Sequence, residues 1–271
     1  MSQTTFVTDY TDYTGPEGLR TRGTVLVVPG RGESEATYRR FGRRLAADSY
    51  RVRVLSAPVI AEGDLAGSLE RFAAQLADAV AGTVAGTGAD GPVRPLVLAG
   101  SDTGAAALAA LVARSAPQSG TPDVPWWPQA LVLAALPGYA AHQPGSWDDE
   151  LNVRTQCSVH RAVLSDDESV PRGALSAAVP GALLDAAYGS TADVPQLLLV
   201  GGADPLADRD ALAHAAKALP AARLVVVRGA HHDVLNDLQH RSVAAEVVTF
   251  LETLRNEPPL EPIVEVESSA W

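Results

Sequence analysis

Short apolar runs alternate with longer segments of helical periodicity along most of the chain. The runs have the length of strands, whereas the longer segments repeat apolar positions every three to four residues. The apolar runs cover 24–30, 50–57, 94–100, 129–137, 194–205 and 222–233. The helical segments cover 36–48, 65–85, a stretch from Thr103, a stretch from about Asp208, and 234–254.

This alternation predicts βαβ units and a parallel sheet. Because the runs are almost continuously apolar, helices must cover both faces of the sheet. The predicted fold class is therefore α/β, with a mostly parallel sheet between helices and a core made of 1–136 and 195–255. The strands expected to run parallel in one sheet end at Gly30, Gly100, Pro137, Gly202 and Arg228.

The alternation is interrupted by the segment 137–194, which opens on the polar stretch "GYAAHQPGSWDDELNVRTQCSVHR". An insertion of this size between strands is either a cap or lid, or a few peripheral helices. We expect it to lie over the carboxyl ends of the strands. The Pro-rich acidic tail, 256–271, either docks through its few apolar side chains or frays.

The composition and net charge of the chain indicate which classes of molecule it is expected to bind. The 271-residue chain has a net charge of −11 and a pI near 4.9. Nucleic acids and anionic membranes are bound by concentrated Lys and Arg, so neither is an expected partner. No apolar run approaches the roughly 20 residues that a membrane span needs. The expected partner is a small-molecule substrate.

The cysteine content, the amino-terminal residues and one glycine-rich loop indicate which cellular compartment and which cofactors to expect. Cys157 is the only cysteine, so neither an intrachain disulfide nor a thiolate metal site is expected. The first twenty residues are polar and acidic, unlike a signal peptide, and a cytoplasmic location is the expectation. Gly86, Gly88 and Gly91 have G-x-G-x-x-G spacing, but they follow a helix and precede a strand. We therefore expect no dinucleotide and no other cofactor.

The stretch "VLAGSDTGAAAL" predicts a strand, a sharp turn and a helix. In a nucleophile elbow the apex residue is strained, and the positions two before and two after it must be small. With Asp102 as the apex, these positions are Gly100 and Gly104. With Ser101 as the apex, one of them is the β-branched Thr103. The glycines favour Asp102, although an aspartate here could also serve as a helix N-cap.

Three motifs together resemble the α/β-hydrolase superfamily over about 24–254. The turn "LLLVGGADPLAD" places Asp204 where the family has its acid, and "RGAHHDVLND" is similar to the histidine segment of monoglyceride lipases and lysophospholipases, which aligns His232 with the catalytic histidine. The elbow is closer to the G-H-D-x-G elbow of haloalkane dehalogenases and epoxide hydrolases. The resemblance implies an α/β-hydrolase fold with a cap insertion and a catalytic triad of Asp102, Asp204 and His232.

The resemblance also implies an oxyanion hole. The loop "VVPGRGES" carries Pro29-Gly30 where relatives carry His-Gly, so the implied donors are the main-chain N–H groups of Arg31 and Thr103. Only backbone groups are needed for this role. The side chains of both residues are therefore expected to be free for specificity.

The chemistry of a carboxylate nucleophile favours attack on an sp3 carbon that bears a halide or an epoxide oxygen, because attack on an ester carbonyl would give an anhydride. Water activated by His232 would then hydrolyse the covalent ester. Two alternatives stay open at this point. One is a serine esterase or lipase that uses Ser101, and the other is a non-catalytic binding protein on the same fold.

Several residues of the insertion are candidates for substrate binding. In "RTQCSVHRAV" the spacing would put several charged side chains on one helical face above the site, where an arginine could clamp a carboxylate. A solvated helix face is the alternative. The candidates are Tyr139, Trp147, Arg154, His160 and Arg161.

Overall fold

Seven strands form one sheet in the computed structural model, in which residues 10–84, 91–116, 120, 122–140, 145–256 and 259–269 are described. The order across the sheet is β1-β3-β2-β4-β5-β6-β7. The strands are β1 (Tyr10–Tyr13), β2 (Gly23–Val28), β3 (Tyr50–Leu55), β4 (Leu96–Ser101), β5 (Ala130–Ala134), β6 (Gln196–Gly201) and β7 (Ala222–Val227). All neighbours pair in parallel except β1 with β3. The predicted parallel sheet is confirmed.

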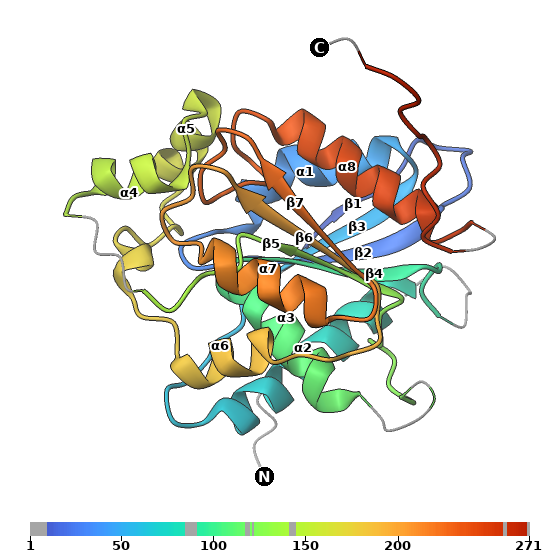
Figure 1. Ribbon diagram of the computed structural model, residues 1–271, viewed down its shortest axis with the longest axis horizontal. Helices are drawn as coiled ribbons and strands as arrows, with labels where there is room; N and C mark the ends of the chain where they lie inside the picture. The colour runs from blue at the N-terminus through green and yellow to red at the C-terminus, as the bar shows by residue number, and fades with distance from the viewer. Residues whose placement is uncertain are drawn as a thin grey trace.

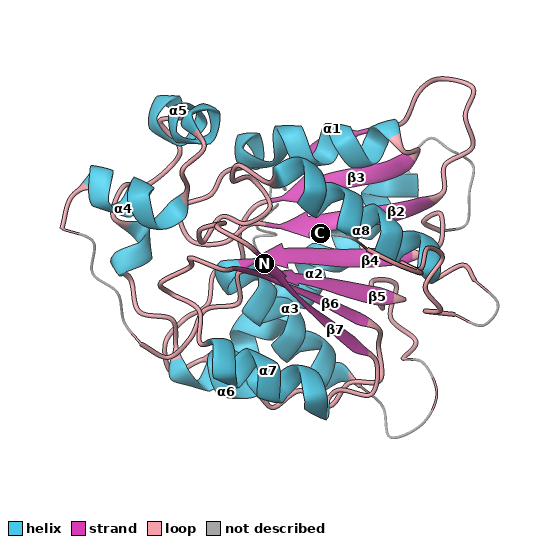
Figure 2. Ribbon diagram, turned by 45° about the horizontal axis from the view of Figure 1, so that its top comes forward, coloured by secondary structure: helices cyan, strands magenta, loops and turns pink. Residues whose placement is uncertain are grey.

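Helices cover both faces of this sheet (Figures 1 and 2). The α-helices are α1 (Arg39–Ala47), α2 (Leu65–Val84), α3 (Asp102–Ser115), α4 (Trp147–Arg154), α5 (Ser158–Asp166), α6 (Gly181–Tyr188), α7 (Arg209–Ala218) and α8 (His240–Thr253); η1 (Glu35–Tyr38) and η2 (Ala174–Ser176) are 3₁₀ turns. One core cluster joins the sheet to α1 and α8, and the other joins it to α2, α3 and α6. The central strands bury both of their faces, as their apolar sequences require.

Two elements differ from the sequence prediction. β1 lies in the polar amino-terminal stretch, where Asp12 accepts hydrogen bonds from the buried Arg53 of β3 at 2.7 and 2.6 Å. A charged edge strand of this kind has no apolar signal. The last helix begins at His240 rather than Val234, because contacts with other loops hold Asp233 and Asp237 in a loop before it. Asp233 contacts His160, and Asp237 accepts from the main-chain N–H groups of Gln156 and His231.

The segment 137–194 is divided between two places. α4 and α5 lie beyond the carboxyl ends of the strands (Figure 2), where the whole insertion was expected. α6 instead packs against α3 in the helical layer, with Leu183, Leu184 and Ala187 buried in the core cluster. The carboxyl ends of β2, β4, β6 and β7 therefore meet a covering made of α4, α5 and the loops around them.

Within the described part of the chain, no helix is long and apolar enough to cross a membrane. Gly86 and Gly88 of the glycine-rich loop lie outside the described residues, as do 257–258 and 270–271 of the tail.

Candidate active site

Asp102 occupies the apex of the turn between β4 and α3. Its φ is +47°, a left-handed conformation that a non-glycine residue rarely adopts. A Cβ on Gly100 would lie 2.7 Å from the Cα of Ala105, and a Cβ on Gly104 would collide with the carbonyl of Pro29. The two glycines therefore permit the tight bend, as the spacing predicted. Ser101 has ordinary extended angles, and its buried side chain interacts with the hydroxyl of Tyr38.

His232 bridges Asp102 and Asp204. Its Nδ1 lies 3.0 Å from Asp204 Oδ2, and its Nε2 lies 3.3 Å from Asp102 Oδ1. Asp204 follows β6, and His232 follows β7, where its main-chain N–H donates to Val153. The predicted contacts of His232 are thus present, and the three side chains come from the carboxyl ends of three strands.

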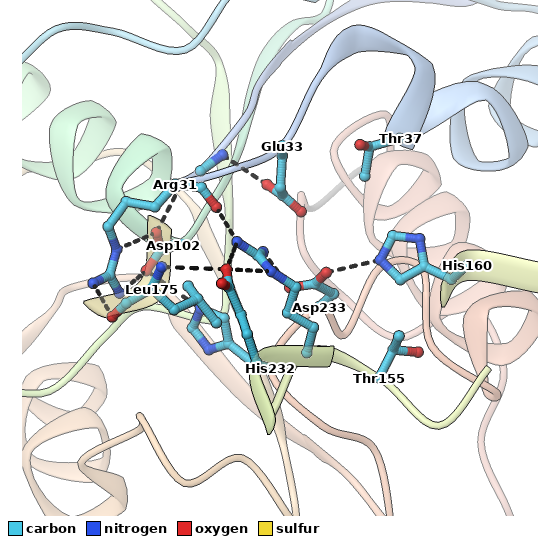
Figure 3. A network of polar contacts seen from close by, with 12 residues as sticks. Arg31, Glu33, Thr37, Asp102, Thr155, His160, Leu175, His232 and Asp233 are labelled. Atoms are coloured by element: carbon cyan, nitrogen blue, oxygen red, sulfur yellow. Dashed lines mark hydrogen bonds and ion pairs between the residues drawn. The ribbon is translucent and has the colours of Figure 1, made fainter. Parts of the chain in front are cut away.

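The Arg31 side chain forms a bidentate ion pair with Asp102 (Figure 3). Arg31 Nε donates to Oδ2 at 2.8 Å, and Nη2 donates to Oδ1 at 2.7 Å. The main-chain N–H of Arg31, the implied oxyanion donor, also donates to Oδ2 at 2.9 Å. The expectation that this side chain is free was therefore wrong, because a buried carboxylate attracts the nearest cation.

Charge pairing shifts the ionisation of both central groups. Burial opposes the charged form of Asp102, but Arg31 and His232 hold the pKa of that carboxyl well below its usual range. Burial also opposes the charged form of His232, yet Asp204 and Asp102 together raise the pKa of His232 to about 10. At neutral pH the site therefore contains an aspartate anion, an imidazolium and a guanidinium.

We expect the His232 imidazolium to persist to about pH 10. Its folded-state pKa is raised above the ordinary 6.5, so its stabilisation is fully present below about pH 6.5 and is lost as the pH rises through about 10. An NMR titration of the ring nitrogens measures this pKa directly. Asp102→Asn should lower it, because one of the two flanking anions is removed. An ordinary histidine pKa in the unaltered protein would contradict the prediction.

Arg154 and His160 do not line the cavity beside Arg31 but lie in a buried charge cluster. Figure 3 shows His160 beside Asp233 in this cluster. Arg154 donates to Glu150 Oε1 at 2.8 Å and to the carbonyl of Arg31 at 2.7 Å. Asp233 lies 3.4 Å from Arg154 Nη1 and 2.8 Å from His160 Nε2. Because α4 ends at Arg154 and α5 begins at Ser158, these side chains share no single helical face.

The other predicted substrate-binding residues are also separated. Trp147 lies in α4, and its indole N–H donates to the hydroxyl of Ser165. Arg161 donates to the side-chain oxygen of Asn152 on the outer surface. Tyr139 lines a cavity of about 40 Å³. The described lining residues are Arg31, 137–140, 175–179 and Leu206. Of the five candidates, only Tyr139 is among the described residues that line this cavity with Arg31.

Sequence reasoning missed the Arg31 side chain and the acids of the buried cluster. Glu150 and Arg154 have the spacing of a helical ion pair, which is a usable signal. Glu33 accepts from the main-chain N–H of Gly30 at 2.7 Å and from Tyr38. Burial, followed by the charge of Asp233, raises the pKa of Glu33 to about 7.

Among the described residues, no group of three or more His, Cys, Asp or Glu side chains is arranged to hold a metal ion.

Comparison with known families identifies the family of the chain. The family model described as serine aminopeptidase, S33, matches residues 20–239, which include β2 to β7 and the three central side chains. The chain belongs to this family. It is a hydrolase of the α/β-hydrolase fold.

Solved structures share the fold at low sequence identity. A monoacylglycerol lipase from Paleococcus ferrophilus is similar with a TM-score of 0.64 and 14% identity, over 90% of this chain and 98% of that chain. A soluble variant of monoglyceride lipase from Saccharomyces cerevisiae has a TM-score of 0.64 and 16% identity, over 90% of each chain. MenH from S. aureus has a TM-score of 0.56 and 14% identity, over 91% and 99%. No curated protein sequence matches the chain.

Proposed function

We propose that this hydrolase uses Asp102 as a nucleophile on an sp3 carbon of a small organic substrate. The observation that carries the proposal is the position of the carboxylate. It stands at the strained apex of the elbow, with His232 Nε2 at 3.3 Å and Asp204 behind the same imidazole at 3.0 Å. This is the arrangement of nucleophile, base and orienting acid that covalent hydrolysis requires.

The first step is displacement at carbon. Asp102 Oδ1 forms a bond to the substrate carbon, and the bond from that carbon to a halide or epoxide oxygen breaks, with its electron pair leaving on that atom. Oδ2 becomes the carbonyl oxygen of the new ester. It already accepts from the main-chain N–H of Arg31 at 2.9 Å. The main-chain N–H of Thr103, in the first turn of α3, is the second donor of the proposed oxyanion hole.

The second step is hydrolysis of that ester by water. His232 is charged in the resting site because two anions flank it. Once Asp102 becomes a neutral ester, one of these anions is gone and the pKa of His232 falls. The imidazolium then gives its proton to the alkoxide of an opened epoxide or, after loss of a halide, to solvent. The neutral imidazole takes a proton from water, whose oxygen attacks the ester carbonyl. Formation of the intermediate thus converts His232 from a proton donor into a base.

The family description favours a second candidate, a serine nucleophile, and Ser101 is the residue beside the apex. A serine esterase would need Ser101 to face His232. Ser101 has extended φ and ψ of −121° and 145°, and its side chain interacts with Tyr38, which belongs to the core cluster on the α1 side of the sheet. These observations favour Asp102.

We expect His232→Ala to accumulate a covalent ester on Asp102. Alkylation needs only the nucleophile, whereas release needs the base. The variant is incubated with short bromoalkanes, epoxides and p-nitrophenyl esters, and peptide mass spectrometry then locates the added mass. An adduct on Asp102 from an alkyl reagent supports the proposal.

His231→Ala is the matched control, because His231 is the adjacent histidine and its ring does not contact Asp102 or Asp204. This variant should turn over without accumulating an adduct. Accumulation in His231→Ala alone would shift the base by one position. An acyl adduct on Ser101 would assign the protein to the serine esterases instead.

A further inference from the structure

The carboxylate of Asp102 has no free position for attack. Within the described residues, Oδ2 accepts from the main-chain N and Nε of Arg31, at 2.9 and 2.8 Å. Oδ1 accepts from Arg31 Nη2 at 2.7 Å and lies 3.3 Å from His232 Nε2. A carboxylate offers about four lone-pair directions, and all of them are directed at donors here. One donor must leave Oδ1 before that oxygen can bond to carbon.

The Arg31 side chain is the donor that can leave. The imidazole of His232 is fixed by Asp204, and the main chain of Arg31 is fixed because its carbonyl accepts from the buried Arg154. The Arg31 side chain is unbranched and 14% exposed, against 3% for Asp102. Its Nη1 donates to the carbonyls of Ala177 and Leu175, at 2.6 and 3.3 Å, beside the cavity. A shift of the guanidinium toward the cavity would release Oδ1.

The cavity presents this guanidinium to an incoming ligand. Among the described residues that line it, Arg31 is the only one with a charged side chain. A molecule that enters therefore meets a cation first and the nucleophile behind it. The planar fork of an arginine matches a carboxylate in two parallel hydrogen bonds, as it already does with Asp102.

We propose that Arg31 is the receptor for a carboxylate of the substrate, and that the substrates are small organic acids with a halide or epoxide on a carbon next to that carboxylate. This inference rests on the proposed function. The substrate carboxylate replaces Asp102 as the partner of Arg31, which frees Oδ1. It also keeps the guanidinium paired after Asp102 becomes a neutral ester, when an uncharged substrate would leave a largely buried cation without an anion.

The reaction balances for a 2-halo acid. Asp102 Oδ1 bonds to C2, and the halide leaves with the electron pair of the C2–halogen bond. Water then adds to the ester carbonyl, and the bond between that carbonyl carbon and the Oδ1 ester oxygen breaks. The products are a 2-hydroxy acid, a halide ion, a proton passed through His232 to solvent, and the regenerated Asp102 carboxylate.

Binding of propionate and propionamide, which differ mainly in charge, tests the receptor without any chemistry. We expect propionate to bind the unaltered protein about tenfold or more tightly than propionamide, measured by calorimetry. Arg31→Met should abolish this preference, whereas Arg161→Met, which removes an arginine from the outer surface of α5, should keep it. Equal binding of the two ligands, no binding of propionate, or a preference that survives in Arg31→Met would overturn the proposal. If Arg31→Met does not fold, the comparison in the unaltered protein still decides.

A second measurement separates this inference from the function on which it rests. His232→Ala is incubated with 2-bromopropionate and with 2-bromopropionamide, and ester formation is compared after correction for the reactivity of each reagent in buffer. The expected result is faster capture of 2-bromopropionate. Equal capture of both reagents on Asp102 would reject the receptor and keep the nucleophile. Arg31-dependent binding of propionate with no ester from either reagent would reject the nucleophile and keep the receptor.

Discussion

Replacing Asp102 with asparagine is expected to lower turnover by a factor on the order of 10⁴ or more, because a neutral amide cannot serve as the carboxylate nucleophile. The substitution preserves side-chain volume at the strained apex, so the elbow itself should persist. The measurement is steady-state turnover on whichever reagent of the electrophile panel the unaltered protein hydrolyses. Thermal unfolding of the same sample checks the fold, since the ion pair with Arg31 is also removed.

Ser101→Ala is the control that matches this substitution in position and size. Ser101 is buried and interacts with Tyr38, and no hydrogen bond joins it to His232 among the described residues, so its removal should leave turnover within a few-fold of the unaltered protein. The opposite pattern, full activity in Asp102→Asn and none in Ser101→Ala, would establish a serine nucleophile. That pattern would also require the elbow to rearrange. With Ser101 as the apex, the β-branched Thr103 would occupy a position where the bend needs a small residue.

Local rules explain why much of this arrangement could be predicted. Apolar runs of strand length and helical periodicity determine the sheet and its layers, and the glycines around Asp102 fix the elbow by steric exclusion alone. Asp204 and His232 follow the carboxyl ends of their strands, and parallel strands bring such residues to one edge. The contacts at 3.0 and 3.3 Å therefore follow from chain order and strand direction.

The remainder depends on partners that are distant in sequence. Arg31 and Asp102 are separated by 71 positions, so nothing local reveals that the guanidinium will pair with the elbow carboxylate. Arg154 similarly meets Asp233 across 79 positions. An arginine in a polar insertion has the same sequence pattern whether it faces solvent, substrate or a buried acid. The buried charge cluster is therefore visible only in three dimensions.

We expect Arg154→Met to destabilise the protein by about 3–5 kcal/mol, because it leaves buried carboxylates without their cation. Arg154 is 1% exposed and pairs with Glu150, which is 0% exposed, at 2.8 Å. It lies 3.4 Å from Asp233, whose pKa is lowered against burial by Arg154 and His160. Methionine fills the volume but offers no donor. Urea unfolding measures the change, which corresponds to a shift in Tm on the order of 10 °C.

Arg161→Met is the control, because Arg161 forms a 3.9 Å pair with Asp148, whose side chain is 86% exposed. An exposed pair of this kind contributes about 0–1 kcal/mol, so this variant should unfold like the unaltered protein. The comparison also decides between two roles for Arg154. If Arg154 clamped the substrate, its replacement would raise KM and leave stability unchanged. If Arg154 is instead a structural cation, its replacement lowers stability, because the guanidinium links α4 to the carbonyl of Arg31 and to the carboxylate of Asp233.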